Sequence, residues 1–320
     1  MNRTLFCYRF LFSLFFFAAA CYRVPDRIDP RVSYPIQDQH FSQLTSAFSP
    51  LSPEERNSEW GREVAIAHAF AEDFDLYRAI STYKRAEILL PPEHKMRKLE
   101  MQYDILLCYF LGKRYNEAID AFDKTDLAFV DKTFAAYHDL LLTLYECYRE
   151  TEDFQKEERI LELMEKSYPE TAEKLRLSSA LREGDLAQLQ TFADGFYQHP
   201  SYLNPLLNTY SEEKKSPLKA QLFNALVPGA GYLYIGQKKS ALTALLLNGL
   251  FIAAATQFFL RGHLAAGIIM TGFEAGWYFG GIYGAGEEAK YYNERLYEKR
   301  AATVLNEHML FPTLMMQYSF

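Results

Sequence analysis

The chain has 320 residues, of which 23% are charged, 49% hydrophobic and 16% aromatic, and its formal net charge is -7. An acidic chain without a basic stripe is a poor candidate for binding nucleic acid, because phosphate binding needs clustered Lys and Arg. We therefore predict no nucleic-acid partner. The composition instead suits a helical domain with several packed faces, together with a segment that lies in lipid.

Residues 1–20 have the three parts of a secretory signal peptide: two early arginines, an apolar run at residues 10–17 and three alanines before Cys21. The apolar run is shorter than the about 20 residues that a membrane span needs. The Ala-Ala-Ala-Cys ending resembles the lipobox of bacterial lipoproteins, although Ala18 replaces the usual leucine. The resemblance implies lipidation at Cys21 and a place in the bacterial cell envelope. Ordinary cleavage that leaves Cys21 unmodified is the alternative.

Residues 21–51 contain four prolines among polar residues, and this composition predicts an extended tether from Cys21. A helix start follows, because Ser52 can cap a helix, Pro53 suits its first position and Glu55 can complete a capping box. Helical periodicity continues beyond it. We assign residues 52–210 to one helical domain.

Three segments of this domain resemble one another at a spacing of 39 residues. Equivalent positions are Phe70, Tyr109 and Tyr148; Ala79, Ala118 and Glu157; Tyr83, Phe122 and Leu161; Pro91, Val130 and Pro169. The pattern resembles the tetratricopeptide repeat (TPR), and a fourth, shorter unit follows at residues 184–186. The resemblance implies stacked helix pairs, at least three of which bury a continuous core, and a concave face that receives a protein partner. HEAT-type repeats, with a period of about 40–47 residues, are the alternative.

Cys108 and Cys147 occupy equivalent positions in neighbouring repeats. Packed helices lie about 8–10 Å apart, whereas a disulfide needs Cα atoms within about 7 Å of each other. We therefore predict that both cysteines are buried free thiols.

Two apolar segments near the C-terminus predict a transmembrane helical hairpin at residues 241–286. Residues 241–260 carry no charge, residues 264–286 carry only Glu274, and three residues separate the two segments. Each segment is long enough to cross hydrocarbon about 30 Å thick. The predicted fold class is therefore all-α, with a TPR-like solenoid followed by a transmembrane hairpin. A buried helix pair in a soluble protein is the alternative.

The second apolar segment carries glycines in three overlapping G-x-x-x-G steps: Gly272, Gly276, Gly280 and Gly284. Small residues let helices approach closely in lipid. We therefore predict that this face packs the hairpin and offers a surface for a homo-oligomer.

Glu274 lies near the middle of the membrane and needs a partner, and Asn248 is the nearest polar side chain in an antiparallel hairpin. An ion or proton path through Glu274 is the alternative.

Residues 211–240 are predicted to form an interfacial segment. Its P-G-x-G-x-x-Y-x-G motif consists of Pro228, Gly229, Gly231, Tyr234 and Gly236. The motif, together with residues 273–285, resembles small bacterial two-transmembrane modules, including those of repeat lipoproteins. This resemblance implies a membrane module and supplies no catalytic residue. A phosphate-binding loop is excluded, because Gln237 stands where such a loop needs lysine.

A cleaved signal peptide places the repeats outside the cytoplasm, and two spans return residues 287–320, a charged helix and tail, to the same side. Basic residues flank the hairpin, however, against the tendency of positive charges to stay in the cytoplasm. A third span at residues 219–236 would remove this conflict. The sequence leaves two and three spans open.

The sequence contains no H-E-x-x-H, C-x-x-C or G-x-S-x-G motif. We therefore predict no catalytic residue, no metal site and no cofactor. The predicted function is a membrane-anchored, non-catalytic envelope scaffold whose TPR-like domain binds a protein partner in envelope assembly or secretion, in contact with membrane lipid. A transport or channel subunit that uses Glu274 is the first alternative, and an accessory to an envelope enzyme is the second.

Overall fold

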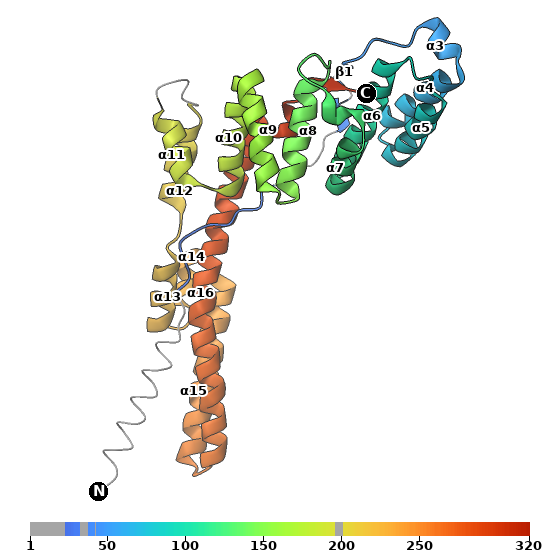
Figure 1. The fold of residues 1–320 in the computed structure, drawn as a ribbon. Coiled ribbons are helices and arrows are strands. Elements are labelled where there is room, and N and C mark those ends of the chain that lie inside the picture. The colour runs from blue at the N-terminus through green and yellow to red at the C-terminus, as the bar shows by residue number, and fades with distance from the viewer. Residues whose placement is uncertain (1–22, 33–37, 42, 196–200) are drawn as a thin grey trace. The chain divides into compact units, whose positions relative to one another are not determined.

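The computed structural model describes residues 23–32, 38–41, 43–195 and 201–320 (Figure 1). Within these residues nearly all regular structure is α-helix, and the two strands contain two residues each. The prediction of an all-α fold is confirmed.

The chain divides into two compact units. Unit 1 contains residues 1–32 and 182–301, and unit 2 contains residues 33–181 and 302–320. Each unit therefore combines a segment from the N-terminal part of the chain with one from the C-terminal part.

Unit 2 consists of short helix pairs. Its elements are α2 (Asp38–Phe41), β1 (Thr45–Ser46), α3 (Pro53–Asn57), α4 (Glu59–Glu72), α5 (Leu76–Leu89), α6 (Lys95–Leu111), α7 (Tyr115–Asp123), the 3-10 helix η1 (Asp126–Phe129), α8 (Tyr137–Glu150), α9 (Phe154–Ser167), α10 (Pro169–Glu183), the 3-10 helix η2 (Pro312–Leu314) and β2 (Tyr318–Ser319). Ser52 caps α3 as predicted, because its Oγ accepts a hydrogen bond from the N–H of Glu55 and its own N–H donates to the Glu55 carboxylate.

The turns within three helix pairs repeat at the spacing of 39 residues. Phe74, Lys113 and Glu152 each adopt the left-handed conformation, with φ of 57°, 56° and 59°. In each turn the next N–H donates to the carbonyl five residues earlier: Asp75 to Phe70 at 2.8 Å, Arg114 to Tyr109 at 2.9 Å, and Asp153 to Tyr148 at 2.9 Å. This pattern closes a helix by satisfying its last carbonyls, and it usually needs glycine at the left-handed position. The same backbone geometry therefore recurs three times with three different side chains.

The core of unit 2 combines bulky and small side chains. Ala79, Tyr83 and Ala86 of α5 are fully buried and lie in one continuous hydrophobic cluster with residues from α4, α6 and α8. Cys108 and Cys147 are buried in the same cluster and carry free thiols. The prediction that the two cysteines are buried and unpaired is confirmed.

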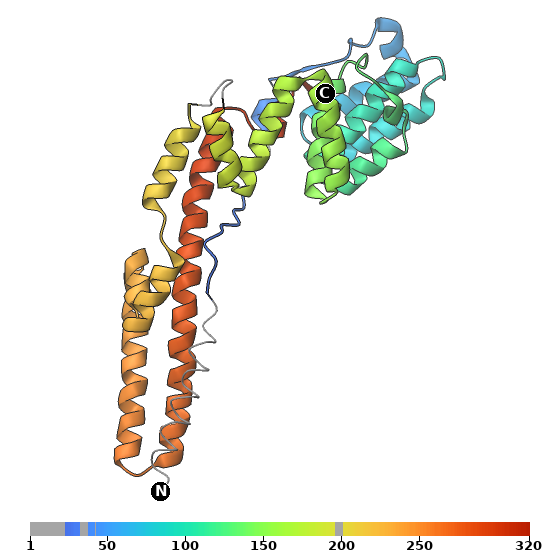
Figure 2. The same cartoon turned by 60° about the vertical axis from the view of Figure 1, so that its left-hand side comes forward.

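Unit 1 contains two short helix pairs and two long helices. Its elements are α11 (Leu186–Asp194), α12 (Leu203–Glu213), α13 (Pro217–Leu226), α14 (Ala230–Ile235), α15 (Lys238–Leu260) and α16 (Leu264–Glu307), whose last residues belong to unit 2. Figures 1 and 2 both show α15 beside α16, joined by a short turn. Gly262 closes this turn with φ of 82°, and the N–H of His263 donates to the Phe258 carbonyl at 2.9 Å.

The two predicted apolar segments lie within α15 and α16, and the predicted charged helix is the continuation of α16. Among the described residues, α15 is the one helix that is long and apolar enough to cross a membrane, and only 11% of its apolar window is buried. The segment 219–236 is divided between α13 and α14. Neither of these short helices reaches the about 20 residues that a span needs.

Candidate functional site

The P-G-x-G-x-x-Y-x-G motif forms the junction of α13, α14 and α15. Gly229 follows Pro228 with φ of 94°, and a Cβ added there would lie 2.3 Å from the carbonyl oxygen of Ala241. A Cβ added to Gly231 would lie 2.3 Å from the carbonyl oxygen of Ala220. These two glycines therefore allow helix backbones to approach more closely than any other residue would permit.

Polar side chains complete the same junction. The carboxamide oxygen of Asn224, which is buried, accepts a hydrogen bond from the N–H of Gly229 at 2.8 Å. The hydroxyl oxygen of Tyr234 accepts a hydrogen bond from the N–H of Ser216 at 3.1 Å. Gly236 ends α14 with φ of 93° and has open space around it. The motif residues thus hold short helices together and offer no reactive group.

The predicted glycine face is open in this chain. A Cβ added to Gly272, Gly276 or Gly280 would meet no atom within 4 Å, whereas one on Gly284 would lie 2.7 Å from the Tyr232 hydroxyl oxygen. Among the described residues no atom thus lies in close contact with the first three glycines, and helix packing across them stays a prediction. A homo-oligomer through this face stays a prediction.

The predicted pair of Glu274 and Asn248 is not formed among the described residues. The side-chain amide of Asn248 donates to the carbonyl of Ala244 in its own helix, at 2.6 Å. The other amide atom, Oδ1, and the Oε2 atom of Glu274 have no hydrogen-bond partner. Asn248 instead lines a cavity of about 680 Å³ together with Gly276, Gly280 and other residues of α15 and α16.

Cys21 lies outside the described residues, so its lipidation stays a prediction.

The C-terminal tail is an ordered part of unit 2. The buried carboxylate of Asp139 on α8 accepts hydrogen bonds from the N–H groups of Gln317 at 2.9 Å and Tyr318 at 2.8 Å. Tyr318 and Ser319 then pair in parallel with Thr45 and Ser46. One acidic side chain therefore holds two successive backbone groups of an extended segment.

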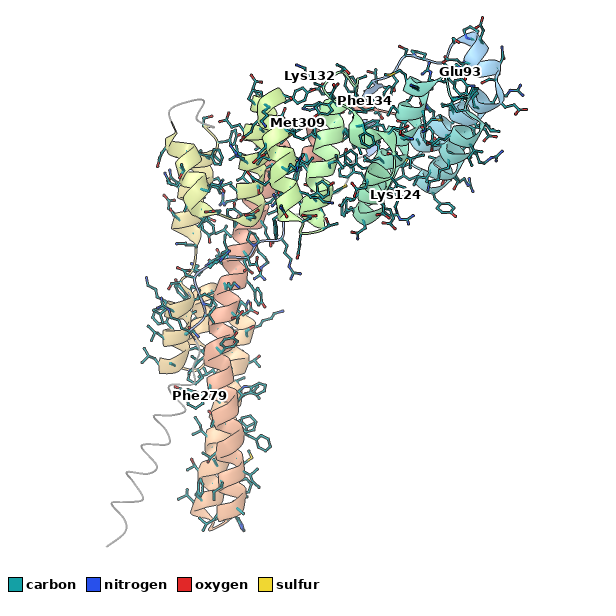
Figure 3. All side chains as sticks on the ribbon, in the orientation of Figure 1. Glu93, Lys124, Lys132, Phe134, Phe279 and Met309 are labelled. Carbon is teal, nitrogen blue, oxygen red and sulfur yellow. The ribbon has the colours of Figure 1, made fainter. Side chains whose placement is uncertain are left out.

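Neighbouring aromatic side chains fix the tether beside this tail. Phe48, which follows β1, contacts the rings of Tyr103 and Phe134 at centroid distances of 5.9 and 5.6 Å, and Phe134 is labelled in Figure 3. Met316 and Phe320 of the tail are buried in the cluster that contains Tyr103. The end of the predicted tether and the predicted tail are thus both packed against the helices.

A second surface of unit 2, the α5–α6 cleft, remains open. This cavity of about 650 Å³ is lined by residues that include Leu90, Pro91, Lys95, Lys98, Leu99, Phe129 and Val130. Phe129 is 88% exposed, and Ile88, next to the cleft-lining Glu87 in the chain, is 84% exposed. Apolar side chains exposed to this extent beside a cavity are typical of a surface that binds another molecule.

A buried acidic–histidine cluster, consisting of His68, Glu100 and Asp104, connects α4 with α6. His68 Nε2 lies 3.6 Å from Asp104 Oδ2 and 4.0 Å from Glu100 Oε1. Burial raises the pKa of Asp104 well above its usual range, and the charge of Glu100 adds to this effect. Burial, followed by the charge of Arg97, lowers the pKa of His68 to about 4. The imidazole is therefore neutral at pH 7, and the cluster can hold a proton or a cation.

Arg97 lies at one side of the cluster and bridges two carboxylates. Its guanidinium is 2.7 Å from Glu100 Oε2 and 2.9 Å from Glu55 Oε2. This contact holds the pKa of Glu55 at about 2.

Sequence reasoning missed the cluster, because Glu100 and Asp104 share a helix face at a spacing of four whereas His68 comes from another helix pair. Only the packing of α4 on α6 joins them.

No protein-family model, no curated protein and no solved structure gives a significant match to the chain. The resemblances to TPR lipoproteins and to two-transmembrane modules therefore rest on the motif residues of this sequence.

Replacing Gly231 with alanine should destabilise unit 1 by about 1–3 kcal/mol, because the new methyl group meets the Ala220 carbonyl, which cannot move without shifting a helix. Gly276→Ala is the matched control, since the space around it is open. Thermal unfolding of the purified chain in detergent measures both variants. Equal stability of the two variants would contradict this role of Gly231.

Replacing Asp104 with asparagine should stabilise metal-free unit 2 at neutral pH by on the order of 1–3 kcal/mol. In the unfolded chain Asp104 loses its proton above its ordinary pKa of 3.8, whereas in the folded chain the raised pKa keeps the proton bound. The stability of the wild type therefore falls as the pH rises. Asparagine removes this penalty, and the difference should vanish near pH 3.5. Melting curves in chelator across this range test it. Exposed Asp126→Asn is the control, and a destabilising Asp104→Asn at pH 7 would refute the assignment.

Proposed function

We propose that this chain is a membrane-anchored, non-catalytic scaffold of the bacterial cell envelope whose TPR-like helix pairs bind a protein partner, in envelope assembly or secretion. One observation carries the proposal: α15 is a helix of 23 residues, and the rest of the described chain buries only 11% of its 18-residue apolar window. Its exposed apolar side chains include Leu242, Leu245, Leu246, Leu250, Ile252 and Leu260. A helix of this length extends about 35 Å, enough to cross the hydrocarbon of a bilayer.

Unit 2 contains residues from before and after the two long helices, and this supports two crossings of the membrane. Residues 33–181 and 302–320 form one compact unit, so they lie on the same side of any membrane that the chain crosses between them. An even number of crossings is then required. One span through α15 alone, or three with residues 219–236 added, would separate the tail from Asp139 on α8. Crossing by α15 and by residues 264–286 of α16 satisfies this requirement.

The position of Val24 supports a lipid anchor at Cys21. A Cβ added to Gly286, the last residue of the proposed second span, would lie 2.8 Å from Val24 Cγ2. The N–H of Val24 also donates to Gln221 Oε1 at 3.3 Å. Because three residues of extended chain reach about 10 Å at most, a lipid on Cys21 would lie close to the membrane boundary at Gly286. The lipid would then insert into the same membrane leaflet from which the hairpin starts and to which it returns.

The helix pairs of unit 2 supply the binding function in this proposal. Their three equivalent turns at a spacing of 39 residues support a stack of TPR-like units. The tail occupies the surface beside Asp139, whereas the α5–α6 cleft is open and carries exposed Phe129. We therefore assign partner binding to the α5–α6 cleft, with Phe129 as the apolar anchor and Lys95 at the polar rim.

A photocrosslinking amino acid at position 129 should form discrete adducts with a partner in intact cells, because Phe129 lines the assigned surface and is 88% exposed. The same group at position 154 is the matched control, since Phe154 is also an exposed aromatic residue of unit 2, at 68%, but lies outside the cleft. Immunoblots and mass spectrometry of the adducts provide the measurement. Adducts at neither position, or equal adducts at both, would contradict partner binding at this cleft.

A further inference from the structure

The three side chains of the acidic–histidine cluster are arranged as chelating ligands. One ligand atom from each of His68, Glu100 and Asp104 lies within 4.8 Å of the other two. Two ligand atoms bound at about 2.0–2.2 Å to a tetrahedral ion are roughly 3.3–3.6 Å apart. The separations of 3.6 Å and 4.0 Å from His68 Nε2 therefore need to contract by only a few tenths of an ångström, and the two carboxylate oxygens, which lie within 4.8 Å of each other, by about 1 Å.

The polar atoms of this cluster lack ordinary partners. Asp104 is 1% exposed, and among the described residues no hydrogen bond of ordinary geometry reaches its carboxylate oxygens, although the Tyr83 hydroxyl lies close enough for a weak one. His68 Nε2 is also buried without a hydrogen-bond partner. Buried polar atoms in proteins nearly always have a good partner, so these converging atoms have unused capacity to bind a ligand.

The local charges favour a divalent cation. Arg97 pairs with both Glu55 and Glu100 Oε2, which leaves Oε1 of Glu100, the atom facing His68, as the available ligand atom of that carboxylate. An ion that displaces the proton of Asp104 would gain the carboxylates of Glu100 and Asp104 as oxygen ligands, and His68 supplies a nitrogen ligand. One nitrogen with two carboxylate oxygens suits zinc and related transition metals, whereas magnesium and calcium prefer oxygen ligands alone. The His68 side chain is 25% exposed, which gives an ion a path from solvent.

We propose that His68, Glu100 and Asp104 bind one divalent transition metal ion, with zinc as the best-fitting member of the class. The ion would join α4 to α6 and so fix the first two helix pairs of unit 2 against each other. Solvent molecules would complete its coordination on the His68 side. This site is independent of the membrane anchor and of the α5–α6 cleft.

Zinc titration of the full-length chain in detergent, after removal of metal with a chelator, tests the proposal. Calorimetry should show one equivalent of zinc bound per chain, with magnesium at least 100-fold weaker. His68→Gln and Asp104→Asn should each weaken zinc binding at least tenfold. His94→Gln is the matched control, because His94 lies in the same unit against Trp60 and outside the cluster, and it should leave binding unchanged.

Melting curves in chelator separate loss of a ligand from loss of fold, since variants that bind less zinc should still melt cooperatively. Cobalt(II) added to the wild type provides a readout that needs no variant: visible absorption bands of a nitrogen- and oxygen-coordinated ion should appear at one equivalent. Absence of stoichiometric binding by both metals would overturn the proposal. Equal zinc affinity in the wild type and in Asp104→Asn would likewise overturn it, by assigning the binding to the surface.

Discussion

The uncovered apolar surface of α15 is the constraint on which the rest of the account depends. A soluble protein buries such a helix in its core, because exposure of apolar area to water is unfavourable. Here only 11% of the apolar window is buried within the described chain. In the proposed function, lipid covers this surface. The proposed membrane anchor rests on this surface, whereas the proposed envelope setting rests on the signal-peptide pattern before Cys21.

The tail places a second constraint on the same chain. Asp139 binds two backbone N–H groups of residues 317 and 318, and the parallel pairing of β2 with β1 brings distant parts of the sequence together. In the proposed topology, this arrangement requires the chain to return to its starting side after the hairpin. It also shows that the helices of unit 2 can hold an extended segment by its backbone, which is a common mode of peptide recognition.

Local chemistry made several features predictable from the sequence. The capping box at Ser52, the ends of the two long helices around residues 261–263 and the free thiols of Cys108 and Cys147 depend on neighbouring residues or on a regular repeat. The spacing of 39 residues was also visible, since it is carried by side chains that fill equivalent positions. These features can be predicted without knowing which distant segments of the chain contact each other.

Features that depend on distant contacts were missed or left open. A two-residue strand has no periodicity to detect, so the pairing of residues 45–46 with residues 318–319 leaves no local signal. The acidic–histidine cluster joins two helices, and the carboxylate spacing on α6 alone is equally typical of a solvated face. The glycines at 272, 276 and 280 indicate close packing in lipid, but the sequence does not tell which helix approaches them.

Cysteine labelling from outside spheroplasts tests the central claim most directly, because the two native cysteines of unit 2 are buried and give little background. Single cysteines would replace exposed Lys132 in unit 2 and exposed His263 in the turn between α15 and α16. A membrane-impermeant maleimide should label Lys132→Cys at once and His263→Cys only after the membrane is opened. Labelling of both sites in intact spheroplasts, or of His263→Cys alone, would contradict an externally facing scaffold held by a transmembrane hairpin.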